Sequence, residues 1–381
     1  GVALTLTFMT PALPEDIDLL ARPVTYLSYD IRATDGRTHD VELYLDALGE
    51  LTVNTPNQEV MWGPGSETAG DLSYLKMGSR QQAVLARKGD DVRIDWGYLY
   101  LAAPTADVGS MAFADRSSLQ ANFIERGLLH GVVAPPSPAA ADRMAAGVTM
   151  GLSRVGDQTV SRWMLLAYDD LYSIQYMKKN LRPYWRRHGW EAVDLLQASS
   201  AEYAGIKERC EAFDAELMSD LTRAGGVNYA LLGALAYRQS LAAGKFVADA
   251  NGQPLQFSKE NHSNGCIGTS DVFYPMAPQF LLFGPSLAKS FLVPFMNYAA
   301  SERWKFPFAP HDLGTYPHAN GQVYGGGERN EENQMPVEES GNLEELGHLL
   351  SGLGAGAVDV VHLTGHADHT TVGPVFLCED P

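Results

Sequence analysis

The sequence is poor in cysteine, in basic residues and in long apolar runs, and each shortage excludes a class of protein. Its three cysteines, Cys210, Cys266 and Cys378, are too few and too scattered for a disulfide framework. The chain has 28 Lys and Arg residues and 46 Asp and Glu residues, which gives a formal charge of −18. This charge argues against nucleic acid as a partner, because phosphate contacts need clustered cations. No apolar run approaches the ~20 residues that cross a bilayer, so we expect no membrane-spanning segment.

The length of 381 residues exceeds what one hydrophobic core usually supports, and two domains are therefore expected. A hydrophobic content of 45% with 19% charged residues is typical of a globular protein. The chain opens with alternating apolar and polar residues, like the middle of a strand, and without Met. We therefore expect a fragment whose missing N-terminus could have carried a targeting segment.

The first half, residues 1–185, is predicted to be a β-sandwich. Residues 24–29 alternate in polarity, and Asp35-Gly36 is a strong hairpin signal that leads to a return strand at 41–46. The Ala- and Pro-rich residues 134–146 are interpreted as a surface loop leading into a short helix. Short strands separated by turns are typical of an antiparallel sandwich. The further strand-like runs are 51–54, 92–102 and 161–168.

The second half, residues 190–350, is predicted to be helical. Apolar residues from Tyr203 to Leu221 recur every three or four positions, which places them on one face of a long helix that ends at Gly225-Gly226. Residues 227–249 are apolar on most sides and are expected to form a helix buried all round. A weaker repeat follows at 275–303, and stacked helical hairpins of this kind would build part of an (α/α)6 toroid with a central cleft. Long loops are expected at 305–327, and the tail at 351–381 has no assignable structure.

Three polar clusters, at residues 257–265, 309–317 and 335–342, lie beside the predicted helices. Each places a carboxylate among amides, aromatic residues and turn-forming residues. Loops of this composition on a helical scaffold are suited to holding and hydrolysing a polar substrate. We expect the three clusters to meet at the mouth of one ring of paired helices.

Several long strings resemble the glutaminase A family of fungi and bacteria, over residues 1–342. In the sandwich part they are Arg22-Pro23-Val24-Thr25-Tyr26-Leu27-Ser28-Tyr29-Asp30 and Leu166-Ala167-Tyr168-Asp169-Asp170. In the helical part they are Ser258-Lys259-Glu260-Asn261, Asp271-Val272-Phe273-Tyr274-Pro275, His311-Asp312 and the run 336–342. The family's chains extend further at both ends, so the resemblance implies a missing part of the sandwich, missing later hairpins and an aberrant tail.

The resemblance implies hydrolysis of L-glutamine to glutamate and ammonia, and secretion or a periplasmic location. It implies a small-molecule substrate, and nothing in the sequence requires a metal or another cofactor. The oligomeric state is left open. Because similar toroids occur in glycoside hydrolases, a glycosidase is an alternative, with Trp304, Tyr316 and Tyr324 stacking on sugars. A catalytically dead binding chain is a third alternative.

The candidate site residues come from the three clusters. The candidate catalytic residues are Glu260, Asp271, Asp312 and Glu339. The candidate substrate-binding residues are Lys259, Asn261, Asn264, His311 and Tyr316.

Each candidate also has a structural interpretation. Lys259 and Glu260 could form an ion pair within a capped loop, and Asp271 could serve only the first turn of a helix. Because neighbouring side chains diverge, His311 and Asp312 are not expected to act as a dyad, and Asp312 is placed in the cleft. Glu338 and Glu339 could likewise satisfy a helix start, although a carboxylate whose pKa is raised by its neighbour suits an acid or base, and Glu339 is favoured.

Two further clusters are assigned no catalytic role. Asp169, Asp170 and Ser173 are interpreted as part of a packed seam between the domains, because no base stands beside the serine. His362 and His366 would share a face on a helix and could bind zinc, but the surrounding Gly and Thr do not favour a helix.

Overall fold

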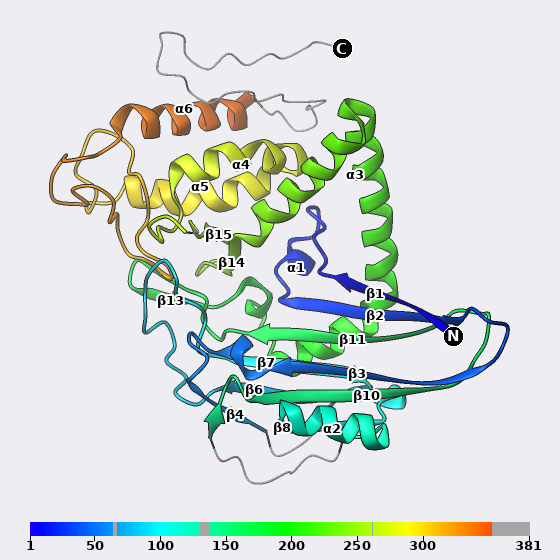
Figure 1. Cartoon of the computed structure of the whole chain (residues 1–381). Helices are drawn as coiled ribbons and strands as arrows, with labels where there is room; N and C mark the ends of the chain where they lie inside the picture. The colour runs from blue at the N-terminus through cyan, green and yellow to red at the C-terminus, as the bar shows by residue number, and fades with distance from the viewer. Residues whose placement is uncertain (64–66, 130–137, 261, 353–381) are drawn as a thin grey trace.

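The computed structural model describes residues 1–63, 67–129, 138–260 and 262–352, with strands in the first half and helices gathered in the second (Figure 1). The larger sheet has eight strands in the order β1-β2-β11-β7-β6-β4-β9, with β5 paired to β6, and the second sheet has the order β3-β10-β8. The larger sheet is built from β1 (Val2–Met9), β2 (Val24–Ala33), β4 (Glu59–Trp62), β5 (Glu67–Ala69), β6 (Leu72–Ser79), β7 (Tyr98–Pro104), β9 (Ala139–Ala140) and β11 (Val160–Asp169). The second sheet is built from β3 (His39–Leu48), β8 (Ser110–Asp115) and β10 (Met144–Val155).

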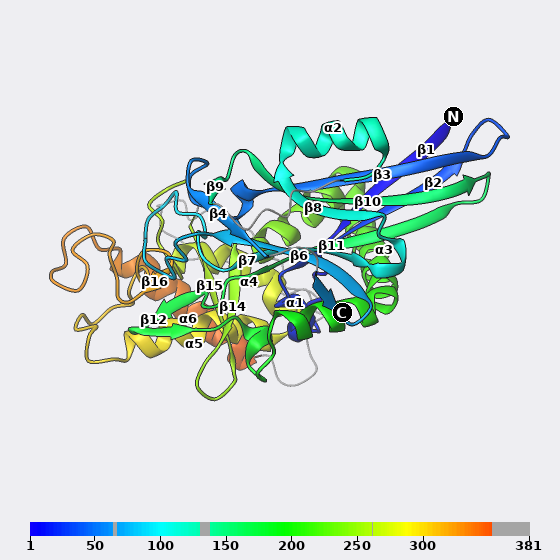
Figure 2. The same cartoon turned by 90° about the horizontal axis from the view of Figure 1, so that it is seen from below.

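The two sheets face each other across a shared core, which confirms the antiparallel sandwich. Leu27 and Leu101 of the larger sheet belong to the same buried cluster as Leu43 and Val148 of the second sheet. A second cluster joins the opposite face of the larger sheet to the start of α3 (Ala192–Ala242). The helix α2 (Arg116–Arg126) covers the second sheet on the side away from α4, α5 and α6 (Figure 2).

The predicted turn at Asp35-Gly36 is present, but the hairpin prediction is wrong. β2 pairs with β1 and β11, whereas β3 pairs with β10 in the other sheet. The Asp35 carboxylate accepts a hydrogen bond from Arg37 N at 3.1 Å, so the Asp-Gly turn reverses the chain as its composition predicts. Turn chemistry sets the local reversal only, and here the reversed strand crosses to the facing sheet.

Other local predictions in the first half also fail. Residues 49–52 form a short 3₁₀ helix, η1 (Gly49–Thr52), closed by a 2.8 Å hydrogen bond from Thr52 Oγ1 to Gly49 O. Only the end of the run 92–102 is a strand, because β7 begins at Tyr98. The chain leads into β9 and β10 after the Pro-rich segment, not into a short helix. The unpredicted α2 is capped by Asp115, whose carboxylate accepts from Ser117 N, and ends at Gly127 in the left-handed region.

The long helix α3 contains the predicted break. Gly226 has φ 83° and ψ 176°, so the element consists of two helices joined at this glycine. The expected burial of the second helix is wrong, since Leu231 and Leu232 are 58% and 67% exposed. The helix ends at Ala242, and the next residues form β14 (Gly244–Ala248), which pairs with β15 (Pro254–Ser258). Phe246 and Val247 are aromatic and β-branched, which favours a strand over a longer helix.

The predicted helical hairpin at 275–303 is present as α4 (Ser270–Phe283) and α5 (Pro285–Ala299), and α6 (Pro336–Gly352) lies beside α4 (Figure 1). The remaining elements are α1 (Ile17–Leu20), η2 (Thr105–Asp107), η3 (Tyr184–Arg186) and a small sheet of β12 (Ile174–Tyr176), β13 (Lys179–Leu181) and β16 (His318–Ala319). Long loops join α5 to α6, as expected for 305–327. Among the described residues, the helices fall short of the length and apolar character needed to cross a bilayer.

Ion pairs and hydrogen bonds join the sandwich to the helical half at the end of β11. Arg186 of η3 donates to Asp169 Oδ1 at 3.0 Å, and both side chains are 2% exposed. Lys245 Nζ of β14 lies 2.9 Å from Asp170 Oδ2, while Trp96 Nε1 donates to Asp170 O at 2.7 Å. Asp169 and Asp170 therefore belong to the packed seam between the two halves.

Candidate active site

Backbone hydrogen bonds bring the three polar clusters together. The loop before α4 and the loop before β16 are joined by Ile267 N to Gly314 O at 3.0 Å and by Leu313 N to Ile267 O at 2.9 Å. Ser340 in the first turns of α6 then accepts from Ala309 N through its hydroxyl at 3.1 Å. The first polar cluster is thus fixed to the second, and the second to the third.

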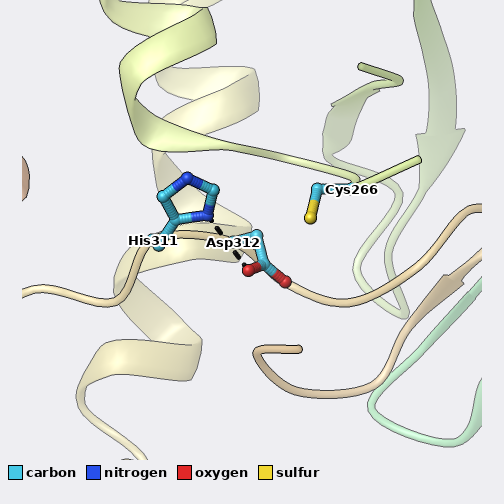
Figure 3. A group of neighbouring side chains, drawn as sticks. All are labelled: Cys266, His311 and Asp312. Carbon is cyan, nitrogen blue, oxygen red and sulfur yellow. Dashed lines mark hydrogen bonds and ion pairs between the residues drawn. The ribbon is translucent and has the colours of Figure 1, made fainter. Parts of the chain in front are cut away.

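His311 and Asp312 contact each other, contrary to the expectation that their side chains diverge. His311 Nδ1 lies 3.1 Å from Asp312 Oδ2 (Figure 3). With Nδ1 donating to this carboxylate, Nε2 is the ring nitrogen that is available to another group. The ring is held in this orientation because it stacks on Tyr324, with centroids 4.1 Å apart and an interplanar angle of 17°.

Asp312 lies beneath the cleft and is not exposed in it. Its side chain is 0% exposed, and its oxygens also accept from three backbone amides. The donors are Gly314 N at 2.8 Å, Val323 N at 3.0 Å and Tyr324 N at 3.1 Å. Because these donors occupy both oxygens, the geometry of Asp312 suits the orientation of His311 better than proton transfer with a substrate.

Asp271 lies in the first turn of α4 and faces the free nitrogen of His311. Its Oδ2 is 3.9 Å from His311 Nε2, too long for a hydrogen bond, and its buried Oδ1 has no hydrogen-bond partner among the described residues. Burial raises the pKa of Asp271, and the nearby Glu260 and Glu338 carboxylates raise it further, whereas His311 lowers it. Asp271 therefore lies both at the start of a helix and beside the candidate site, so its two interpretations do not exclude each other.

Glu339 lies in the first turn of α6 and completes the cluster. It is 1% exposed, and neither carboxylate oxygen has a hydrogen-bond partner among the described residues. Burial raises the pKa of Glu339 to about 9, with smaller contributions from the Asp271, Glu338 and Asp312 carboxylates. Glu339 is consequently protonated at neutral pH. One side-chain oxygen or nitrogen from each of Asp271, His311 and Glu339 lies within 4.8 Å of the other two, close enough to hold one small ligand or ion.

Cys266 is a neighbour of this cluster that the sequence did not single out. Its sulfur points toward Asp312, and its Sγ, one His311 nitrogen and one Asp312 oxygen also lie within 4.8 Å of one another (Figure 3). Burial raises the pKa of the Cys266 thiol, and the Asp312 and Glu260 carboxylates raise it further. A neutral buried thiol is a poor nucleophile and a poor metal ligand. The sequence suggested Tyr324 only as a residue that stacks on a sugar. Nothing in the sequence indicated that its ring would stack on His311.

The other predicted residues lie around the cluster. Glu260 accepts from Thr269 Oγ1 at 3.4 Å and is close enough to raise the pKa of Asp271. Lys259 instead lies against the sandwich, where its ammonium donates to Asp90 O and lies 5.6 Å from the ring centroid of Tyr316. Lys259 and Tyr316 therefore lie together against the sandwich loop at Asp90.

The remaining candidates from the sequence are the amides Asn261 and Asn264 and the histidines of the tail. Asn264 is exposed, and its Oδ1 accepts from Cys266 N at 2.8 Å, which stabilises the turn before Cys266. Asn261 lies outside the described residues. The same holds for His362, His366 and His369.

Comparisons with known proteins agree with this architecture. The sequence model "Domain of unknown function (DUF5127)" matches residues 1–220, and the model "Glutaminase A six helical-hairpin domain" matches residues 226–349. The chain therefore belongs to the family defined by the first domain, and its second half matches the helical domain of glutaminase A. The resemblance noted from the sequence is thereby confirmed.

Two curated relatives carry glutaminase names. The chain is 26% identical over 360 residues to "Glutaminase A" of Aspergillus oryzae, which covers 90% of this chain and 49% of the relative. It is 24% identical over 369 residues to "Probable glutaminase" of Arthroderma benhamiae, covering 91% and 41% respectively. The chain thus spans about half the length, or less, of these relatives. A solved structure, "Putative kojibiose phosphorylase from human microbiome", aligns with a TM-score of 0.26 and 8% identity over 85% of this chain and 28% of that one, a likeness too weak to support an argument.

Proposed function

We propose that the chain contributes the catalytic cluster of a glutaminase A-type hydrolase, which converts L-glutamine and water to L-glutamate and ammonia. The observation that carries the proposal is the protonated, buried Glu339 beside the proton acceptors Asp271 and His311. Amide hydrolysis needs one group that takes a proton from water and another that gives a proton to the leaving nitrogen. The names of the two relatives point to the same reaction.

The proposed roles follow from the protonation states. Glu339 carries a proton at neutral pH and is the donor to the amide nitrogen. His311 Nε2 and Asp271 Oδ2, 3.9 Å apart, are the acceptors for the proton of the attacking water. The C–N bond breaks as Glu339 gives up its proton, and the products are glutamate and ammonia. Asp312 is the positioning residue that fixes the tautomer and the plane of His311.

The remaining candidates are assigned to substrate recognition. Glutamine carries an ammonium and a carboxylate beyond its amide, so a site for it needs both an anionic and a cationic partner. Glu260 is the proposed partner of the ammonium because it is the carboxylate next to the cluster. Lys259, Asn264 and Tyr316 remain proposals for the outer part of the site, and Asn261 remains one by sequence alone. Secretion or a periplasmic location is proposed on the family resemblance.

The test is ammonia and glutamate release from L-glutamine, measured beside sugar release from model glycosides. We expect turnover of glutamine only. Sugar release without glutamine turnover would favour the glycosidase alternative. If the folded protein turns over neither substrate, a chain that only binds a ligand is favoured. The structure offers little for a sugar, because Trp304 is buried in the helical core and Tyr324 is stacked on His311.

A further inference from the structure

In the cluster of Asp271, His311 and Glu339, three buried carboxyl oxygens have no hydrogen-bond partner among the described residues. His311 Nε2 is an acceptor because Asp312 holds the ring proton on Nδ1. Asp271 Oδ1 and both oxygens of Glu339 are buried and lack a hydrogen-bond partner among the described residues. Buried polar atoms without partners are costly, so a group of them aimed at one point indicates a ligand that supplies donors.

The chemistry of the missing ligand follows from these acceptors. Once the proton of Glu339 and the proton taken from the attacking water have both passed to the leaving nitrogen, the cluster holds the Asp271 and Glu339 carboxylates and the Nε2 acceptor of His311. A species with several N–H donors and a positive charge satisfies all three groups. A carboxylate would meet only acceptors of its own kind and is rejected. The side-chain carboxylate of glutamate therefore has no place there.

We propose that Asp271, His311 Nε2 and Glu339 form a cage that binds the ammonium ion. The source of that ion rests on the proposed function, because hydrolysis of an amide releases ammonia at this point. As the C–N bond breaks, the leaving nitrogen takes the proton of Glu339. It then takes the proton that His311 or Asp271 removed from the attacking water, and it remains as ammonium between the two carboxylates.

A divalent metal ion is the rival occupant. His, Asp and Glu side chains are also ligands for zinc, and Asp312 behind His311 is the usual kind of supporting carboxylate. Ammonium is favoured because the proposed reaction produces it at this point, whereas a metal ion would have to be supplied from outside.

The experiment is a thermal-unfolding titration of the chain with ammonium chloride at pH 7.5. Potassium chloride and tetramethylammonium chloride at equal ionic strength control for charge, since neither cation has an N–H donor. A ligand that binds only the folded protein raises the Tm, and at saturating ammonium we expect a rise of roughly 2–4 °C over the controls. Glu339→Gln is expected to abolish this rise. Glu338→Gln, the same substitution at the adjacent exposed residue, is expected to keep it.

Several results would overturn the cage. The first three are an equal rise in Tm with potassium, a rise retained by Glu339→Gln, and no rise at any ammonium concentration. The fourth concerns the rival metal ion: the ammonium effect is lost when zinc is added, or a chelator restores it. Circular dichroism of both variants checks that they fold. Glutamate formation is measured in parallel, so that the two proposals fail separately. Turnover without ammonium binding removes only the cage, and ammonium binding without turnover removes only the proposed reaction.

Discussion

Asp312 and Glu339 are both buried carboxylates, yet their surroundings give them opposite chemistry. Asp312 accepts hydrogen bonds from three backbone amides and from His311, so both of its oxygens have donors. Glu339 has no donor among the described residues, and burial, with its acidic neighbours, raises its pKa to about 9. The site therefore places an orienting carboxylate beside a protonated acid, a division of roles that suits acid–base catalysis.

Glu339→Gln is expected to stabilise the protein while it lowers activity. In the unfolded chain Glu339 loses its proton near pH 4.5, whereas in the folded chain it keeps it to about pH 9. Between these values the native state binds the extra proton, so stability falls as pH rises. At pH 7 the cost is on the order of 3 kcal/mol, and Gln removes it. The free energy of unfolding in urea should therefore increase in the variant, more at pH 8 than at pH 5.

The activity of the same variant should fall by roughly 10²–10⁴-fold, the range for loss of a general acid. Glu338→Gln is the matched control and should retain turnover, because Glu338 is exposed. Equal losses in the two variants would contradict the assignment of the proton to Glu339.

Asp312→Asn tests the positioning of His311. The amide would place donors against the backbone N–H groups that now donate to Asp312, so we expect a loss of roughly 1–3 kcal/mol in stability. It would also no longer hold the proton on Nδ1, and kcat should fall roughly 10²-fold with little change in KM. The readout specific to positioning is the ¹⁵N NMR tautomer of His311, which should change from Nδ1–H to Nε2–H or a mixture. An unchanged tautomer would argue against the role.

At the level of elements, the starts of two helices bring the acids together. Asp271 and Glu339 each lie in a first helical turn, where the helix dipole favours a carboxylate. Their side chains meet because α4 lies beside α6. A helix start was one interpretation of each carboxylate from the sequence, but the sequence could not predict that the two first turns are neighbours.

The seam between β11 and η3 gives a stability prediction. Arg186→Met would leave the Asp169 carboxylate buried without its cation, which typically costs 3–5 kcal/mol. Arg182→Met is the control, because the Arg182–Glu191 pair is exposed and such pairs contribute ~0–1 kcal/mol. Urea denaturation of both variants checks the difference. Similar small losses in the two would show that the buried pair is not important for the seam.

Failures of the sequence predictions have a common physical cause. Sequence patterns correctly predicted that β1, β2, β3 and β11 are strands. They do not report the partner strand, so the crossing from β2 to β3 was taken for a hairpin. In the same way, the apolar residues around Leu231 indicate a helix but not what covers it. The His311–Asp312 contact was missed because it depends on loop dihedral angles that sequence spacing does not encode.

At the scale of the whole molecule, the sandwich and the helical half are predicted to unfold together. The seam contains a buried ion pair at Asp169 and a partly exposed one at Asp170, and α3 contributes to the core of the larger sheet. We therefore expect thermal unfolding followed by near-UV and by far-UV circular dichroism to give one coincident transition. Two separated transitions would show that the halves are independent.

The most direct test of the account is the titration of Glu339 by ¹³C NMR of its side-chain carboxyl carbon, assigned by comparison with Glu339→Gln. The account predicts a protonated carboxyl throughout the neutral range, with a midpoint near pH 9. A midpoint near the ordinary glutamate value of about 4.5 would contradict it. The cluster would then have no acid to protonate a leaving amide nitrogen.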